Sequence, residues 1–336
     1  MQKRIVPFLL AVIAVLSAGS VRAGWPKRVF APYMYVGAGD NFKLTDCDDQ
    51  CGLKFYTLAF IIARQDGDGG NATYHSEPSW DGRIPMDENF YTNQIAAIRE
   101  RGGDVIMSFG GEAGKEIAIV ETNLTTLEAD YQGIIDRYHF TWLDFDIEGD
   151  NLNNVDANSR RNTALAELQK NNPGLIISYT LPVDPHGISD ESVALLTDAV
   201  KQGVKVYSAN LMVMYFGKEF TGKGKSEGQL GIDSANVAYA QLQKIDPAMQ
   251  VGLCPCLGRN GSSTEIFGIE DAKTIKAFAD KTPWVCSLHY WSINDDAARP
   301  RRKRKAAPNT GTNNVAVPAP PQAWAFAKKF ETFTTP

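Results

Sequence analysis

The sequence predicts an α/β fold in which eight parallel strands alternate with helices and close into a (β/α)₈ barrel, the TIM-barrel architecture. Three observations lead to this prediction. Eight short apolar runs, rich in β-branched and aromatic residues, recur along the chain. Amphipathic stretches separate most of them, which favours parallel pairing through helical crossovers. The chain has 336 residues, 43% hydrophobic and 22% charged, which is enough for one large core.

The predicted elements follow one another in a regular order. The strands are expected at 29–36, 55–63, 104–109, 139–147, 175–181, 206–215, 250–256 and 285–293. The helices are expected at 92–101, from a capping box at Thr125–Glu128, and at 159–170, 190–202, 233–245, 269–280 and 321–330. The first crossover, 37–52, is the weakest because it is short and polar. The basic and proline-rich segment 299–320 is expected to form a flexible loop before the last helix.

An open, doubly wound sheet is the alternative architecture. Such a sheet usually carries a glycine-rich phosphate-binding turn after its first strand. Here that turn reads Gly37-Ala38-Gly39-Asp40-Asn41-Phe42 and lacks the third glycine. The sequence therefore favours the barrel and gives little support for nucleotide binding.

Residues 1–23 have the pattern of a secretory signal peptide: basic Lys3 and Arg4, an apolar run, and a small-residue cleavage site ending at Ala23. The apolar run is too short to span a bilayer comfortably, and an uncleaved anchor is the alternative. Cleavage would remove three of the 34 basic residues and none of the 39 acidic ones, changing the formal net charge from −5 to −8. We therefore expect a secreted, single-domain protein over 24–336 that binds no nucleic acid and, after cleavage, no membrane.

Five cysteines lie in the remaining chain, and an exported protein is expected to pair some of them as disulfides. Cys47 and Cys51 are close in sequence, and Cys286 could meet Cys254 or Cys256. The alternatives are buried thiols or a metal site at Cys254-Pro-Cys256. No His lies nearby with ligand spacing, so neither a metal nor a cofactor is expected.

The fourth predicted strand carries an acid at every second position: Asp144, Asp146 and Glu148. Side chains alternate across a strand, so these three acids share one face, and in a closed barrel that face points inward. Phe145 and Ile147 then pack outward beneath the helices. Neighbouring carboxylates repel one another, so at least one should hold a proton near neutral pH. An exposed sheet edge or a Ca²⁺ site is the alternative, and the flanking apolar residues argue against the edge.

At these residues the chain resembles glycoside hydrolase family 18, the chitinase family, and in particular its microbial branch. The family pattern on the fourth strand is Asp-x-x-Asp-x-Asp-x-Glu. Asp144, Asp146 and Glu148 fill its last three acidic places, and Thr141 stands in the first. By parity, Thr141 faces away from the other three, so its change should affect structural support more than proton transfer.

Other short motifs match the family in barrel order. Ser108 to Gly111 resembles its Ser-x-Gly-Gly, Ala31-Pro32-Tyr33 lies on the first strand, and Trp291 stands where the family keeps a tryptophan beneath the sugar. The run from Cys256 to Ala272 also resembles the microbial branch. The sixth strand departs: Met212-Val213-Met214 is followed by Tyr215 where an Asp is usual.

The resemblance implies a retaining mechanism in which the substrate's own acetamide attacks the anomeric carbon. It implies that Glu148 is the general acid, that Asp146 orients the acetamide, and that Asp144 shares a proton with Asp146. The implied substrate-binding residues are Trp291, Tyr215, Met212, Gly111, Tyr33 and Ser108.

We therefore expect a monomeric chitinase acting on chitin or N-acetylglucosamine oligosaccharides. The alternatives are an endo-β-N-acetylglucosaminidase acting on N-glycans, which needs the same acids, and a chitin-binding lectin on the same barrel. Lectin relatives usually lose the terminal Glu, and Glu148 is present. The changes at Thr141 and Tyr215 keep the lectin open.

Overall fold

A computed structural model describes residues 24–37, 43–67, 71–86, 89–262, 264–297 and 322–335. The predicted signal peptide at 1–23 and the basic loop at 299–320 lie outside the described residues. The main sheet is mostly parallel. Its successive parallel strands are β3 (Phe55–Asp66), β6 (Asp104–Gly110), β7 (Trp142–Asp146), β8 (Ile176–Pro182), β9 (Val206–Met212), β10 (Gln250–Leu253) and β13 (Val285–Leu288).

The first predicted strand forms two short pieces, β1 (Val29–Phe30) and β2 (Tyr33–Tyr35). They are separated at Pro32, which has no N–H to donate to a ladder. β1 pairs in parallel with β13, and β2 pairs in parallel with β3. Between the two pieces, Ala31 N donates to Leu288 O at 2.9 Å and Thr57 N donates to Pro32 O at 3.0 Å. This one segment therefore bonds to strands at both ends of the parallel series, as in a TIM-barrel-like α/β fold.

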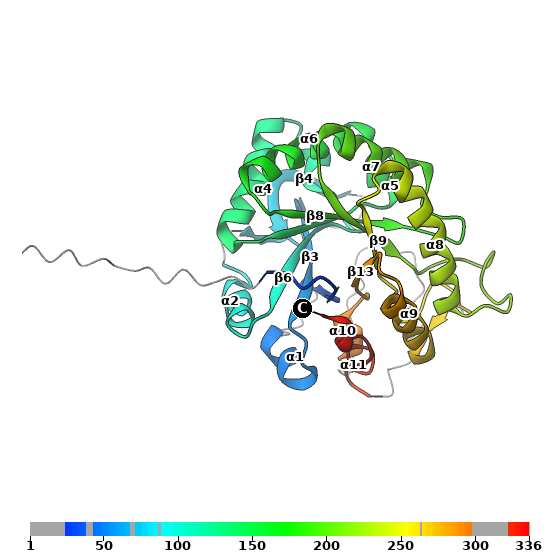
Figure 1. Ribbon diagram of the computed structural model, residues 1–336. Helices are drawn as coiled ribbons and strands as arrows, with labels where there is room; N and C mark the ends of the chain where they lie inside the picture. Colours follow the sequence, from blue (N-terminus) through cyan, green and yellow to red (C-terminus); the bar gives the residue numbers. More distant parts are fainter. Residues whose placement is uncertain are drawn as a thin grey trace, which may run out of the picture.

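Helices lie around the outside of these strands (Figure 1). The longer ones are α1 (Leu44–Cys51), α2 (Thr92–Glu100), α4 (Leu124–Tyr138), α6 (Val155–Asn171), α7 (Asp190–Gln202), α8 (Glu227–Ile245) and α9 (Ile269–Lys281). The short ones are α3 (Ile117–Val120), α5 (Gly149–Leu152), α10 (Ile293–Asp296) and α11 (Ala327–Phe330). Within the described residues, no helix combines the length and the apolar character needed to cross a membrane.

Two local features differ from the sequence predictions. Helix α4 begins at Leu124, and the side chain of Asn123 caps it by accepting from Thr126 N at 3.1 Å. The capping box proposed at Thr125 is therefore wrong. Strand β3 also runs past its predicted end and pairs in antiparallel fashion with β4 (Thr73–Trp80), which in turn pairs with β5 (Ile84–Pro85). A second small hairpin joins β11 (Gly258–Arg259) to β12 (Ile266–Phe267).

Phe145 of β7 and Ile147, which directly follows β7, pack between the sheet and the helices, as predicted. Phe145 and Ile147 are fully buried in the large core cluster. The Phe145 ring stacks on Phe109 of β6 with centroids 5.0 Å apart, and Tyr131 of α4 meets both rings edge-on. This packing fixes the orientation of β7 and turns its even-numbered side chains the other way.

No disulfide forms within the described residues, which include all five cysteines, so the expected pairing is absent. Cys47 and Cys51 lie one turn apart on α1, and Cys51 Sγ donates to the Cys47 carbonyl at 3.1 Å. Cys254 packs with Tyr33, whereas Cys256 accepts a hydrogen bond from the Tyr215 hydroxyl. The buried-thiol alternative describes these side chains.

Candidate active site

Asp144 lies at the centre of a buried hydrogen-bond network. Its side chain is fully buried, and its Oδ2 accepts from Tyr33 Oη of β2 at 2.8 Å and from Ser108 Oγ of β6 at 2.8 Å. The structure therefore brings two of the sequence-predicted residues to this acid. Burial raises the pKa of Asp144, while hydrogen bonds from Ser178, Ser108, Tyr33 and Thr180 oppose the rise.

Three further donors to Asp144 were missed in the sequence. They are Ser178 Oγ at 2.6 Å, Thr180 Oγ1 at 3.0 Å and Asn210 Nδ2 at 3.0 Å. The alternation of polar and apolar residues that identified the acids could also have identified these donors. Ser178 and Thr180 alternate with apolar residues on β8, and Asn210 does so on β9. Polar side chains at every second position of a buried strand indicate an inward-facing polar layer.

Asp144, Asp146 and Glu148 together are here called the acid ladder. Asp146 is its middle member and is 4% exposed. It is hydrogen-bonded to Glu148, and burial, the charges of Glu148 and Asp144, and that hydrogen bond raise its pKa well above the ordinary value. The sequence led us to expect a shared proton between Asp144 and Asp146. The carboxyl pair joined here is Asp146 with Glu148, because Asp144 is already occupied by donors from neighbouring strands. Asp146 Oδ1 is buried and has no hydrogen-bond partner among the described residues.

Glu148 follows the carboxyl end of β7 and is half-buried. Burial raises its pKa to about 7, and the nearby charge of Glu112 adds to the rise. Hydrogen bonds from Asp146 and from the Glu112 backbone act in the opposite direction. A carboxyl with a pKa in this range can hold a proton and release it near neutral pH, which is the property a general acid needs.

Trp291 lies beyond the end of β13 and is half-buried within a group of aromatic rings. Phe60 stacks on it with ring centroids 5.6 Å apart, and the rings of Tyr33 and Tyr35 lie 5.9 and 6.0 Å away. Because Tyr33 also bonds to Asp144, this aromatic group adjoins the acids. Phe60 was not anticipated, since its strand reads as uniformly apolar.

Gly111 follows β6 and approaches both the ladder and the aromatic group. Its N–H donates to the Asp146 carbonyl at 2.9 Å. Its φ of +86° is left-handed, and a Cβ at this position would lie 2.7 Å from the Phe60 ring. Only glycine fits here without moving its neighbours.

For the remaining predicted positions, the structure shows other contacts. Met212 is the buried last residue of β9, whereas Met214 is the methionine that packs against the cluster of Tyr33, Ala59 and Cys254. Tyr215 is 51% exposed, and its hydroxyl donates to Cys256 instead of reaching the ladder. Thr141 precedes β7 and accepts from Trp25 Nε1 at 3.0 Å.

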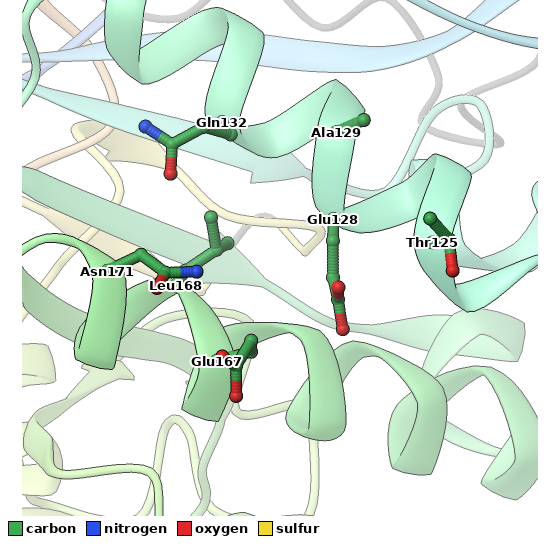
Figure 2. A pocket seen from close by; sticks show the side chains of 7 residues that line it. All are labelled: Thr125, Glu128, Ala129, Gln132, Glu167, Leu168 and Asn171. Atoms are coloured by element: carbon green, nitrogen blue, oxygen red, sulfur yellow. The ribbon is translucent and has the colours of Figure 1, made fainter.

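Two surface depressions lie away from these residues. One is between α4 and α6 (Figure 2), lined by Thr125, Glu128, Ala129, Gln132, Glu167, Leu168 and Asn171. The other is lined by residues near the amino-terminal ends of β7 and β8. We place the candidate site at the ladder because the inward carboxyls of altered pKa and the aromatic group meet there, at the strand ends where such barrels do chemistry. Within the described ranges, no group of three His, Cys, Asp or Glu side chains is placed to hold a metal ion.

Comparison with known proteins identifies similar chains. No profile of a known protein family matches. The probable bifunctional chitinase/lysozyme of Escherichia coli K12 is 29% identical over 300 residues, covering 83% of this chain and 32% of the relative. Endochitinase 11 of Metarhizium anisopliae is 28% identical over 294 residues, covering 83% of this chain and 54% of the relative. The alignments thus span about a third and about half of these curated relatives.

A solved structure agrees with the sequence matches. The catalytic domain of a hyperthermophilic chitinase from Pyrococcus furiosus is 28% identical, with a TM-score of 0.74. The match covers 92% of this chain and 96% of that domain. Catalytic-site mutants of the Pyrococcus enzyme have also been solved with chito-oligosaccharides. Both the sequence and the fold are therefore similar to those of chitinases, which supports the resemblance to glycoside hydrolase family 18, the chitinase family.

Proposed function

We propose that this protein is a secreted, monomeric chitinase that hydrolyses β-1,4 linkages between N-acetylglucosamine residues with retention of configuration. The proposal includes closure of the eight parallel strands into a complete (β/α)₈ barrel. The backbone bonds of segment 29–36 to both β13 and β3 support that closure. The chitinase relatives, and the chito-oligosaccharides bound by the Pyrococcus enzyme, support the choice of substrate.

One observation carries the proposal. Glu148, a half-buried carboxyl with a pKa raised to about 7, is hydrogen-bonded to Asp146, whose buried Oδ1 has no partner among the described residues. A buried acceptor without a donor is costly unless a ligand supplies one. The N–H of a bound 2-acetamido group is a donor of the required kind. A site for proton transfer beside a site for an acetamide favours a hydrolase over a lectin.

The first chemical step breaks the glycosidic bond. Glu148 gives its proton to the glycosidic oxygen while the acetamido carbonyl oxygen attacks the anomeric carbon, and the leaving sugar departs as an alcohol. The resulting oxazolinium ring is positively charged. Asp146, as a carboxylate, accepts the ring N–H and stabilises that charge. In this reactive state the proton shared by the pair resides on Glu148.

The second step restores the enzyme. Water attacks the anomeric carbon from the side the leaving group vacated, and the Glu148 carboxylate removes its proton. The oxazolinium opens to the free acetamide, so the product keeps the β configuration. Asp144 accepts hydrogen bonds from four strands, which hold its carboxylate, and hence its negative charge, in a fixed position next to Asp146.

Other side chains bind and orient the sugar in this proposal. Trp291 supports the reacting sugar on its partly exposed ring, and Tyr33 and Ser108 fix the inner acid. Gly111 keeps the backbone beside Asp146 free of a side chain. Tyr215 is a partly exposed residue that offers its ring to the sugar, and Met212 ends β9.

Acetamide dependence tests the proposed function. We expect purified protein to cleave chitohexaose and to release products that are initially in the β form, as seen by proton NMR within minutes of mixing. Cellohexaose and fully deacetylated glucosamine hexamer should not be cleaved, because neither carries the attacking carbonyl. Cleavage of all three at similar rates, or initial release of the α anomer, would rule out the substrate-assisted mechanism.

Replacing Glu112 by Gln should change the pH profile. The Glu112 charge raises the pKa of Glu148, so its removal lowers that pKa. The general acid works while protonated, so activity is present below its pKa and lost as pH rises through it. We expect the alkaline limb of kcat/KM, near pH 7 in the wild type, to move to lower pH. Asp156→Asn removes an equal charge from an exposed position on α6 and is the control. An unmoved limb in Glu112→Gln would contradict this electrostatic account.

A further inference from the structure

Next to the aromatic group, an acid from the β4–β5 turn meets a tyrosine from the end of β2. Tyr35 Oη donates to Asp81 Oδ1 at 2.7 Å, and the Tyr35 ring lies 6.0 Å from the Trp291 ring. Asp81 N donates to the carbonyl of Phe60, the residue whose ring stacks on Trp291. The hairpin carrying Asp81 is thus joined to the aromatic group through both its backbone and its side chain.

Both members of the pair are held in place from several sides. Asn294 of α10 binds the Tyr35 backbone twice: its Oδ1 accepts from Tyr35 N at 2.8 Å and its Nδ2 donates to Tyr35 O at 3.0 Å. Gly37 leaves room for the acid, since a Cβ at that position would lie 1.9 Å from Asp81 Oδ2. Asp81 itself has a left-handed φ of 52°, a conformation that Asp and Asn adopt more readily than most residues. Such rigid placement is typical of a binding site.

Tyr35, Asp81 and Trp291 are all partly exposed, so a ligand can reach them. Burial raises the pKa of Asp81, while the Tyr35 hydrogen bond and the charge of Arg83 oppose the rise. An aromatic surface bordered by a fixed carboxylate suits a sugar, whose C–H face packs on the ring while its hydroxyls donate to the acid. Nothing in the family motif includes either Tyr35 or Asp81.

We infer that Asp81 and Tyr35 form a second sugar subsite, adjoining the one that Trp291 supports, in which Asp81 accepts hydrogen bonds from hydroxyls of the next N-acetylglucosamine residue. This inference rests on the proposed function, because it assigns a specificity-determining role within the same substrate site. The subsite binds ground state and transition state alike, so it contributes to KM and leaves kcat nearly unchanged.

The variant Asp81→Asn tests the inference while keeping the backbone conformation that Asn tolerates. We expect KM for chitohexaose to rise roughly five- to twentyfold, as for loss of one charge-assisted hydrogen bond, with kcat within about twofold of wild type. Tyr35→Phe, which releases Asp81 but keeps the ring, should raise KM by a smaller factor. Asp66→Asn is the matched control: Asp66 lies at the end of β3, opposite β4, is exposed, and pairs with Arg64 and His75.

The outcomes separate this inference from the proposed function. An unchanged KM in Asp81→Asn, or a fall in kcat alone together with a lower melting temperature, would mean that the pair only fastens the hairpin and would overturn the subsite. If the wild type shows no turnover, calorimetric titration with chitohexaose decides. Weaker binding by Asp81→Asn than by wild type and Asp66→Asn supports the subsite. Equal binding, or none to wild type, overturns it.

Discussion

Glu148→Gln is expected to lower kcat on chitohexaose by roughly two to four orders of magnitude, the usual contribution of a general acid. The amide has nearly the same shape as the carboxyl and can still hydrogen-bond to Asp146, but it has no proton to give to the glycosidic oxygen. The variant should fold normally and bind chito-oligosaccharides about as well as the wild type. Steady-state kinetics, with calorimetry for binding, provide the measurement.

Asp150→Asn is the matched control for this variant, because Asp150 is an exposed acid two residues further along the chain, on α5. Its rate should be within about twofold of wild type, as for most exposed substitutions. A fluorogenic chitobioside with an activated leaving group should lose less activity in Glu148→Gln than chitohexaose does, because its oxygen needs less protonation. Near-normal chitohexaose cleavage by Glu148→Gln would remove Glu148 from the mechanism.

Asp146→Asn is expected to lower kcat by roughly two to three orders of magnitude, comparable with removing a group that stabilises developing charge. An amide oxygen can still accept the acetamide N–H, but it carries no negative charge to set against the oxazolinium. The loss should therefore be in kcat, with KM changed little. Chitohexaose kinetics and a thermal melt, compared with Asp150→Asn, separate this effect from unfolding.

The two acid variants can be told apart by their leaving-group dependence. Oxazolinium formation is required whatever the leaving group, so Asp146→Asn should lose as much activity on the fluorogenic chitobioside as on chitohexaose. Glu148→Gln should lose less activity on the chitobioside than on chitohexaose. Equal behaviour of the two variants on both substrates would mean that the division of roles between Asp146 and Glu148 is incorrect.

Much of the parallel sheet could be predicted because its strands are apolar, β-branched runs of the right length. The clearest case is α7, whose structural bounds are those predicted, since a serine cap precedes it and Gly203 follows it. The β4–β5 hairpin could not be predicted, because Thr73–Trp80 is largely polar and its strand character comes from pairing with β3. That hairpin supplies Asp81, so the second subsite was also absent from the sequence prediction.

The acid ladder was predictable for a different reason. Three acids with period two in an apolar run can face only one side of a strand, and Phe145 and Ile147 determine which side. The partner of Asp146 was not predictable, because it depends on how many donors already occupy Asp144. Ser178 and Thr180 come from β8 and Asn210 comes from β9, and no local pattern in the sequence shows that all three donate to Asp144.

Asp144 gathers hydroxyl and amide groups from β2, β6, β8 and β9 onto a single carboxylate. A shift in register of any of these strands would remove a hydrogen-bond donor from Asp144 and so change its pKa. Because the charge of Asp144 acts on Asp146, the pKa of Asp146 would change as well. The acidity of the candidate active site therefore depends directly on the alignment of the strands around it. Substitutions elsewhere in the sheet that alter strand alignment should reveal themselves first as altered pH dependence, before any loss of structure.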